Sequence, residues 1–441
     1  MEKYYPLNTR MPSRDFMLKV NGKDVVVNGT SIGSFAVIEA DEDVVSVEVI
    51  NCSVNPIFDV KVRPLSLGIE PKLQDEPELL KRHSIFFDLP VPARVSVELD
   101  GRLDMPLFLF AYKGKAERPE GDKVRVYEAG SHEVDEIHLG DGETLYLEEG
   151  AWVYGNVFVE GDDVRICGRG VLSGERFPMG RQCGKGHSMI VAKGCKNLVI
   201  EDITILDGPG WHVVPSGCTN LRISGMNILG RVRSGDGIDL CCCQDVLVEG
   251  CFIRVHDDCI VLKGIHDPEK RDIRNVLAQN CVLFNWEGGN AIEIGYENGC
   301  KEITDVTFRD IDIIHSLWEG LGSGAAISIH NGNIAHVHDI LFDDIRVEDA
   351  REKLFDIKML TAIWNPGCVG GPVTDILFRN IRVVEGPFPA SIIRGWDYNS
   401  MIHRITFENI EILGKKVLNT LDAHMVCEMA TDVVFTDGAE E

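Results

Sequence analysis

The chain has 441 residues, 44% of them apolar, and its 70 Asp and Glu residues outnumber 44 Lys and Arg residues to give a formal net charge of −26. This charge disfavours tight binding to nucleic acid or to an anionic membrane, because both need clustered Lys and Arg. A run of about 18 apolar residues, the minimum for a membrane span, is absent. The first residues also lack the apolar core of a secretory signal, so we expect a cytoplasmic protein.

Residues 1–135 carry short apolar runs that Pro, Gly and Asp interrupt. Examples are VKVRPL from Val60, HSIFFDL from His83 and ARVSVELD from Ala93. Such runs, bounded by turn residues, are typical of strands. We therefore predict a small antiparallel, sandwich-like β domain here. The remaining part of the chain, 136–441, follows a different pattern.

One short phrase recurs along this second part. It reads NLVIEDITIL from Asn197, NLRISGMNIL from Asn220 and DVLVEGCFIR from Asp245, and six further copies begin at residues 163, 275, 305, 339, 375 and 404. Each copy opens with a polar or turn residue and contains two alternating apolar bursts, which indicate two strands joined by a corner. A repeat of 20 to 50 residues without helical periodicity predicts a solenoid of stacked coils. The expected fold class is all-β, a parallel β-helix.

Equivalent positions of the repeat form columns that we expect to point into the coil. One column holds mostly Ile and Cys: Ile203, Met226, Cys251, Cys281, Ile311, Ile345, Ile381 and Ile410. Cys195, Cys218 and Cys243 form a second, three-coil column. None of the 14 cysteines forms a C-x-x-C pair, so small apolar core residues are favoured over a redox or zinc site. No metal or other cofactor is expected.

A further strand precedes each main copy, and aligning these strands brings polar residues together. The aligned segments include DGIDLCCC, DCIVLKG, NAIEIGY, AAISIHNG and TAIWNPG. Their inward column is predicted to run through Ile238, Ile260, Ile292, Ile327 and Ile363. The outward columns then hold Asp239, Glu293, Ser328 and Trp364, and, two places further on, Lys263 and His330.

Acidic residues concentrate on adjacent coils of this alignment. Asp236 lies 22 residues before Asp258, which is one short coil, and Asp257 and Asp239 are close by. A single Asp here would be explained by the preference of Asp for turns. Several converging carboxylates repel one another and raise at least one pKa, which creates the acid and base pair that glycoside hydrolysis needs. We favour chemistry over turn geometry for the cluster, with Trp211 and His212 beside it.

The stretches GPGWHVVPSGC, RSGDGIDLCCC, VHDDCIVLKG and EGGNAIEIGYE resemble the polygalacturonase family, glycoside hydrolase family 28, over roughly residues 140 to 415. The preceding β domain resembles the layout of the related dextranase and isopullulanase group. The family's Asn-Thr-Asp motif corresponds to Ser234-Gly235-Asp236 and its Asp-Asp motif to Asp257-Asp258. The resemblance implies a right-handed parallel β-helix and inverting hydrolysis of a glycosidic bond in an oligo- or polysaccharide.

In this resemblance Asp257 is the general acid, and Asp236 and Asp258 hold and deprotonate the attacking water. Inversion predicts that the acid and the base lie about 6.5–9.5 Å apart, which leaves room for that water.

The chain departs from the family where the substrate carboxylate would be bound. The Gly-His-Gly motif appears as Gly289-Asn290-Ala291, and the Arg-Ile-Lys motif as Ser328-Ile329-His330. The Arg and Lys that grip a uronate are therefore replaced, and Glu293 adds negative charge. We expect a neutral or partly charged sugar, although Lys263 keeps a galacturonide possible. The predicted substrate-binding residues are Trp211, His212, Asp239, Lys263, Asn290, Glu293, Ser328, His330 and Trp364.

Three alternatives stay open at this point. The first is a polygalacturonase proper. The second is a polysaccharide lyase, which would need a basic group and a calcium-neutralised uronate that the acid cluster could help to bind. The third is a non-catalytic carbohydrate-binding solenoid, in which the acid cluster would be an unexplained energetic cost.

Overall fold

A computed structural model describes residues 12–53, 57–74, 84–177, 188–318, 322–363, 365 and 369–438. The chain divides into two compact units. The first comprises Met1–Arg118, Glu128–Ser131 and Glu149–Ala151, and the second comprises Pro119–Tyr127, His132–Glu148 and Trp152–Glu441. Among the described residues, no helix is both long enough and apolar enough to cross a bilayer.

The first unit consists of two five-stranded sheets. One has the strand order β2-β1-β5-β8-β7 and the other β3-β4-β10-β9-β6. Their apolar faces share one core, in which Val47 and Ile85 of the first sheet pack with Val95 and Leu109 of the second. The strands are β1 (Phe16–Val20), β2 (Lys23–Val25), β3 (Asn28–Thr30), β4 (Gly33–Ala40), β5 (Val44–Asn51), β6 (Val60–Arg63), β7 (Lys72–Leu73), β8 (Ser84–Pro90), β9 (Ala93–Leu99) and β10 (Leu107–Lys113), with one 3-10 turn, η1 (Leu65–Leu67).

The pairing in this unit is mixed, because β10 pairs with β4 in parallel. The sequence predicted only antiparallel strands. Parallel pairing needs a long connection, and the chain supplies one by adding β5 to β9 between the two strands. The likeness of this unit to the dextranase group stays a prediction.

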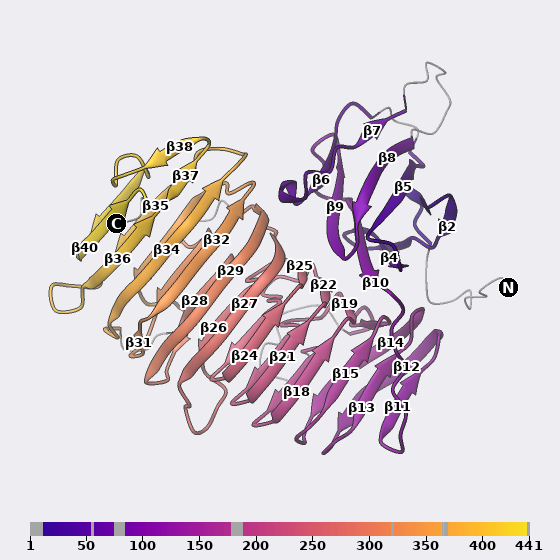
Figure 1. Cartoon of the computed structure of the whole chain (residues 1–441). Helices are drawn as coiled ribbons and strands as arrows, with labels where there is room; N and C mark the ends of the chain where they lie inside the picture. The colour runs from indigo at the N-terminus through magenta and orange to yellow at the C-terminus, as the bar shows by residue number, and fades with distance from the viewer. Residues whose placement is uncertain are drawn as a thin grey trace. The chain divides into compact units, whose positions relative to one another are not determined.

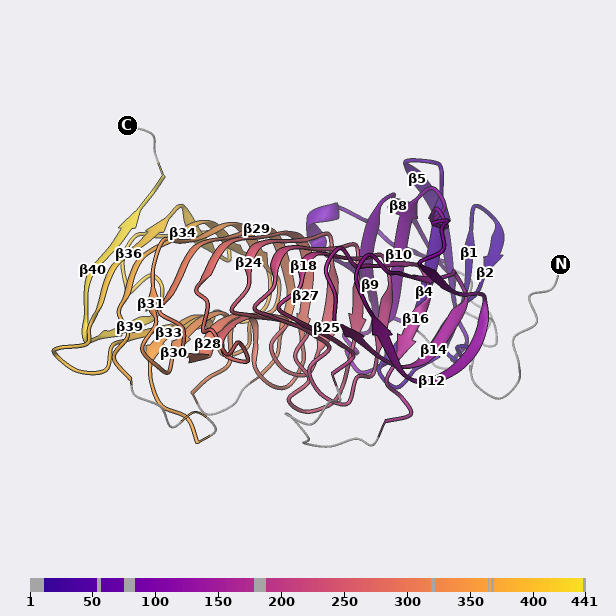
Figure 2. The same ribbon diagram turned by 90° about the horizontal axis from the view of Figure 1, so that it is seen from below.

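The second unit is a parallel β-helix, as the repeat predicted, and Figure 1 shows its coils stacked in chain order. Its first strand, β11 (Val124–Tyr127), already pairs with β13. The coil therefore starts before residue 136, where the sequence placed the boundary. The strands pair in parallel from coil to coil along three faces (Figure 2).

The first face carries the opening burst of each repeat. Its strands are β11, β13 (Thr144–Leu147), β15 (Arg165–Gly168), β18 (Lys196–Glu201), β21 (Thr219–Ser224), β24 (Gln244–Glu249), the first parts of β27 (Ile273–Asn285), β29 (Glu302–Ser316), β32 (Ile340–Val347) and β34 (Val373–Val383), then β36 (Ile402–Glu408) and β40 (Ala430–Thr436).

The second face carries the second burst. It comprises β14 (Ala151–Val159), β16 (Val171–Ser173), β19 (Thr204–Leu206), β22 (Asn227–Leu229), β25 (Phe252–Val255), the later parts of β27, β29, β32 and β34, and β37 (Ile410–Ile412). The further strands are β12 (Gly130–Leu139), β31 (His336–Val337) and β38 (Lys415–Val417).

The third face carries the candidate site. Its strands are β17 (Ile190–Lys193), β20 (Val213–Ser216), β23 (Ile238–Cys241), β26 (Ile260–Gly264), β28 (Asn290–Asn298), β30 (Ala325–Asn331), β33 (Lys353–Met359), β35 (Ala390–Arg394) and β39 (Met425–Glu428).

The polar residue that opens each repeat forms the corner into the first face. All nine of these residues have a positive φ, between 53° and 58°. Asn and Asp tolerate this left-handed conformation better than most side chains. Their side chains also bond from coil to coil: Asn197 Nδ2 donates to Asp163 Oδ1 (2.7 Å), and Asn220 Nδ2 donates to Asn197 Oδ1 (2.6 Å). A ladder of side-chain hydrogen bonds therefore joins the corner residues of these successive coils.

The predicted inward columns are confirmed. Every member of the Ile and Cys column is at most 1% exposed, and Cys195, Cys218 and Cys243 are buried on successive coils. The core they join continues along the whole coil and includes stacked Phe308, Phe342 and Phe378. Because every coil rests on its neighbours, the third face is held in a fixed register.

Candidate active site

The candidate catalytic residues lie at the entry to two adjacent strands of the third face. Ile238 of β23 pairs with Ile260 of β26, so Asp236 and Asp258, each two places earlier, occupy the same position on neighbouring coils. The backbone fixes this register, since Gly237 N–H donates to Asp258 O (2.8 Å). Carboxylate oxygens of Asp236, Asp257 and Asp258 lie within 4.8 Å of one another. The structure therefore brings the three predicted acids together.

The separation of the acid and the base stays a prediction. We expect about 6.5–9.5 Å between the carboxyl groups of an inverting pair, whereas the 4.8 Å limit applies to one oxygen of each acid. A water molecule held by this cluster would contact its carboxylates directly.

Lys263 supplies the positive charge of the cluster. Its Nζ lies 2.6 Å from Asp236 Oδ2 and 2.8 Å from Asp239 Oδ1. Burial opposes the charged ammonium, but the charges of Asp236 and Asp239 outweigh burial and hold the pKa of Lys263 well above its usual value. Lys263 thus remains a cation. Burial nevertheless raises the pKa of Asp239 well above its usual value, although the lysine charge opposes this shift.

Asp257 and Asp258 both bind a proton more readily than an ordinary carboxyl group. Burial, followed by repulsion from Asp236, raises the pKa of Asp257 to about 7 and that of Asp258 well above its usual value. Asp258 Oδ1 also accepts hydrogen bonds from Asn290 N (2.8 Å) and Nδ2 (3.1 Å), which favour its carboxylate form. Two such neighbours titrate as a pair. Asp257 is the more exposed of the two and therefore the better placed to give the proton to a substrate.

His212 has a different role from the predicted one. It is fully buried, and its Nδ1–H donates to the backbone oxygen of Asp236 (2.6 Å) while its Nε2 accepts from Gly208 N (3.3 Å). Burial lowers the pKa of the imidazole, which matches this neutral form. Because backbone groups occupy both ring nitrogens, His212 positions Asp236 and does not contact the substrate.

Trp211 is half-buried beside the cluster. Lys263 Nζ lies 3.7 Å from its ring centroid, and His266 meets the ring in an edge-on arrangement. This cation–π contact also stabilises the charged form of Lys263. The predicted contact of Trp211 with sugar stays a prediction.

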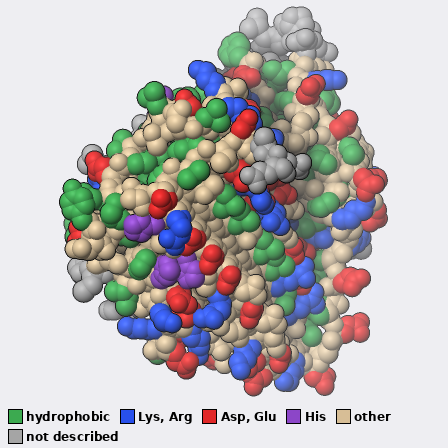
Figure 3. All heavy atoms as spheres, turned by 60° about the vertical axis from the view of Figure 1, so that its left-hand side comes forward, with side chains coloured by type: hydrophobic (Ala, Val, Ile, Leu, Met, Phe, Trp, Pro, Cys, Tyr) green, Lys and Arg blue, Asp and Glu red, His purple; other side chains and the backbone are tan. Residues whose placement is uncertain are grey.

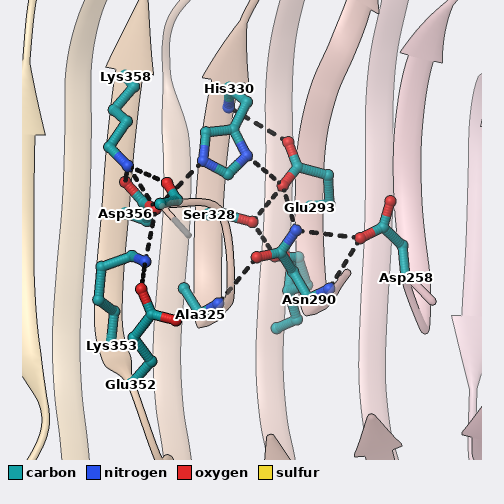
Figure 4. Close-up of polar contacts among 12 residues, drawn as sticks. Asp258, Asn290, Glu293, Ala325, Ser328, His330, Glu352, Lys353, Asp356 and Lys358 are labelled. Atoms are coloured by element: carbon teal, nitrogen blue, oxygen red, sulfur yellow. Dashed lines mark hydrogen bonds and ion pairs between the residues drawn. The ribbon is translucent and has the colours of Figure 1, made fainter. Parts of the chain in front are cut away.

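Beyond Asp258, the outward positions of the next coils form a continuous buried network (Figure 4). Glu293 accepts from Asn290 Nδ2 (2.9 Å), from Ser328 Oγ, and from His330 N (3.2 Å), and its Oε2 lies 2.8 Å from His330 Nδ1. Burial lowers the pKa of His330, but Glu293 and Asp356 outweigh it and raise the pKa to about 9. The predicted Asn290, Glu293, Ser328 and His330 thus meet, but they bond to one another.

The network extends to a strand that the sequence analysis missed. Strand β33, KLFDIKM, pairs with β30 so that Ser328 faces Asp356 and His330 faces Lys358. Asp356 Oδ2 lies 3.4 Å from His330 Nε2 and 3.2 Å from Lys353 Nζ, and its Oδ1 lies 2.8 Å from Lys358 Nζ. The alternation of Lys, Leu, Phe, Asp and Ile in this segment is the sequence feature that could have identified it as a strand.

The predicted alignment of TAIWNPG with the third face is therefore wrong. Ile363, expected to point inward, is 98% exposed, because β33 already fills that coil. Trp364 lies outside the described residues, and its predicted outward register belongs to Asp356.

The cations of this network are all matched by carboxylates. His330, Lys353 and Lys358 lie beside Glu293, Glu352 and Asp356. All but Glu352 are less than 9% exposed. In the view of Figure 3, acidic and basic side chains also alternate over the visible surface. At the cluster itself, three convergent carboxylates could hold a cation, but Lys263 already contributes a positive charge there.

A sequence model described as glycosyl hydrolases family 28 matches residues 156–427. The chain belongs to this family. Its members are inverting O-glycosyl hydrolases.

The similar curated proteins are distant. A probable polygalacturonase of Vitis vinifera is 34% identical over 197 residues, which is 37% of this chain and 40% of that protein. Rhamnogalacturonase A of Aspergillus niger is 27% identical over 127 residues, 29% of this chain and 26% of that protein. These matches thus span less than half of each relative.

Solved structures show the same fold. An exopolygalacturonase from Thermotoga maritima has a TM-score of 0.57 at 17% identity, over 71% of this chain and 84% of that chain. The family 28 exopolygalacturonase of Yersinia enterocolitica has a TM-score of 0.57 at 12% identity, over 90% of this chain and 96% of that chain.

Proposed function

We propose that this family 28 glycoside hydrolase cleaves pectin-type oligosaccharides by inversion, with Asp257 as the general acid and Asp236 and Asp258 as the groups that activate water. The observation that carries the proposal is the convergence of the three carboxylates beside Lys263. This arrangement offers one protonated acid and at least one ionised base in the same place, as hydrolysis of an acetal requires.

The reaction follows from these positions. Asp257 transfers its proton to the glycosidic oxygen as the bond to the anomeric carbon breaks. A water held by Asp236 and Asp258 attacks that carbon from the opposite face of the ring and gives its proton to one of the two carboxylates. Lys263 donates to Asp236 and Asp239 throughout the step, because its ammonium lies within 2.8 Å of both.

The sugar that faces the buried network is proposed to be neutral. Binding a uronate there would require an unmatched cation, and the described cations of the network all have carboxylate partners. A polysaccharide that joins neutral sugars to uronates, such as rhamnogalacturonan, meets this requirement. The likeness to a rhamnogalacturonase over part of the chain is consistent with that choice.

Cleavage of galacturonan is the second candidate. The likeness to named polygalacturonases favours it. Lys263 was the cation that could have bound a uronate at this position, but Asp236 and Asp239 already engage its ammonium. We therefore rank this candidate below the neutral sugar.

The test is an assay of Asp257→Asn on rhamnogalacturonan and galacturonan oligosaccharides. Loss of the acid is expected to lower kcat by a factor of about 100 or more, with an unchanged circular dichroism spectrum. The control is Asp135→Asn, because Asp135 is an exposed carboxylate in strand β12. Full activity of Asp257→Asn would refute the assignment. Wild-type activity is expected to persist in EDTA, since no step uses a metal.

A further inference from the structure

Asn290 holds one oxygen of Asp258. Its backbone N–H (2.8 Å) and its side-chain Nδ2 (3.1 Å) both donate to Asp258 Oδ1. Among the described residues no donor contacts Asp258 Oδ2, and Figure 4 shows this oxygen pointing away from Asn290. The two bonds therefore fix the direction of the carboxylate and leave its second oxygen for the water that Asp258 is proposed to hold.

The side-chain amide of Asn290 has one orientation that fits its surroundings. Its Nδ2 gives one proton to Asp258 and the other to Glu293 Oε2 (2.9 Å). Its Oδ1 accepts from Ala325 N (2.9 Å). A flipped amide would turn its oxygen towards two carboxylates and its NH2 group towards the N–H of Ala325. Glu293 and Ala325 together thus decide how Asn290 meets Asp258.

Glu293 is itself held by the next coil. It accepts from Ser328 Oγ and from His330 N (3.2 Å), and its Oε2 lies 2.8 Å from His330 Nδ1. The ring of Tyr296 stacks on the imidazole of His330, with 4.6 Å between the ring centroids. Glu293, Ser328 and His330 are each 0% exposed, so they offer no surface to a sugar. Their hydrogen bonds reach the catalytic acids through Asn290.

Stability alone does not explain this network. Three carboxylates and three cations contact one another in it: Glu293, Glu352, Asp356, His330, Lys353 and Lys358. The desolvation cost of burying such ion pairs is about as large as their attraction, and apolar residues of similar volume are often at least as stable. A fully connected polar network does, however, hold its side chains in one arrangement. Its role is therefore expected at the end that contacts Asp258.

We propose that Glu293 is a positioning residue that acts through Asn290 on Asp258, and so directs the free oxygen of Asp258 towards the attacking water. The proposal rests on the proposed function, in which Asp258 helps to activate that water. Ser328 and His330 serve the same end, because they hold Glu293 in place. Since Glu293 does not touch the substrate, its loss is expected to lower kcat and to leave KM nearly unchanged.

The experiment is a double-mutant cycle of Glu293→Gln and Asn290→Ala. We would measure kcat on whichever of the rhamnogalacturonan and galacturonan oligosaccharides the wild-type enzyme cleaves. Each single variant is expected to lower kcat by about tenfold, because a small misplacement of a reacting group is enough for such a loss. Both changes act on the same contact, so the double variant should also lose about tenfold and not about 100-fold. KM should change by less than about twofold in each variant.

The matched control is Asp343→Asn, which also removes a buried, ion-paired carboxylate. Asp343 is 7% exposed on strand β32 and accepts from Arg379 Nη2 (2.8 Å). Its variant is expected to keep the wild-type kcat. The charge of Glu293 also contributes to raising the pKa of Asp258. Glu293→Gln should therefore move the acidic limb of the kcat profile to lower pH, whereas Asp343→Asn should leave it in place.

Additive losses in the cycle, or a wild-type kcat in Glu293→Gln, would overturn the proposal. If circular dichroism shows that Glu293→Gln does not fold, Ser328→Ala takes its place, because it removes only one donor to Glu293. Ser328→Ala is expected to lower kcat by about threefold, and to have no further effect in the Asn290→Ala background. An unchanged kcat or additive losses in this second cycle would equally overturn the proposal. Failure of the proposed function has a different result, namely full activity of Asp257→Asn or no cleavage by the wild-type enzyme.

Discussion

At the scale of single residues, the chemistry of the site depends on the neighbours of each buried acid. Asp236 and Asp239 share one ammonium, that of Lys263. Asp258 accepts hydrogen bonds from Asn290, yet burial raises its pKa well above the usual value. Among the described residues, neither an ammonium nor a side-chain hydrogen-bond donor contacts the Asp257 side chain, and burial raises its pKa to about 7. The chemistry of the four acids therefore differs because their neighbours differ.

Lys263→Met is predicted to impair catalysis by removing the cation of the cluster. We expect kcat/KM to fall by about 100-fold and the acidic limb of its pH profile to move to higher pH, because the carboxylates lose the charge that favours their ionised form. Lys263→Arg, which keeps the charge, should restore part of the activity. An acidic limb that stays in place in Lys263→Met would show that Lys263 has only a structural role.

Asp257→Asn is predicted to stabilise the protein near neutral pH. The folded carboxyl has a pKa of about 7, above its value of about 4 in an unfolded chain. Stability is therefore lost as pH rises between these values, and the Asn variant avoids this loss. We expect its free energy of unfolding to exceed that of wild type by about 1 kcal/mol or more at pH 7.5.

Urea unfolding of both proteins at pH 7.5 and at pH 4 measures this difference. At pH 4 the folded carboxyl is protonated and the unfolded one is about half protonated, so the advantage of the variant should shrink to a few tenths of a kcal/mol. A variant that is equally stable, or less stable, at pH 7.5 would contradict the raised pKa.

At the scale of elements, the sequence predicted the coil well and the third face only in part. The corner residues and apolar alternation of each repeat are local signals, so the register of Ile238, Ile260 and Ile292 could be read directly. Strand β33 was missed because three of its seven residues are charged, as in an exposed segment. Burial of Asp356 and Lys358 depends on His330 and on the neighbouring coils, which the sequence of β33 does not show.

The same limit applies to His212. His212 could not be distinguished from a sugar ligand by its position beside Trp211, because its role depends on the backbone of Asp236.

Asn220→Ala is predicted to destabilise the coil at its ladder of side-chain hydrogen bonds. Asn220 has a φ of 56° and donates to Asn197. Alanine would lose the hydrogen bond and would also adopt the left-handed conformation less readily, at a total cost of about 1–2 kcal/mol.

Asn220→Gly tests the backbone contribution, because glycine accepts this conformation without strain. The glycine variant is expected to lose less stability than the alanine variant in urea unfolding. Equal losses would indicate that φ at this corner contributes little.

At the scale of the whole molecule, repeat spacing alone predicted the stacked coil, and stacking brings Asp236 next to Asp257 and Asp258. The family model covers residues 156–427, which include this entire site. The missing Arg and Lys at Ser328 and His330 could be read from the sequence, whereas their replacement by a buried, charge-matched network could not, because it depends on Asp356 of the next coil.

The most direct test of the account is the anomeric configuration of the first product, followed by proton NMR during cleavage of a rhamnogalacturonan oligosaccharide. Water attack assisted by Asp236 and Asp258 predicts that the newly formed reducing end appears first in the inverted configuration and then mutarotates. A product that first appears with the original configuration would contradict the account, and so would an unsaturated sugar that absorbs in the ultraviolet.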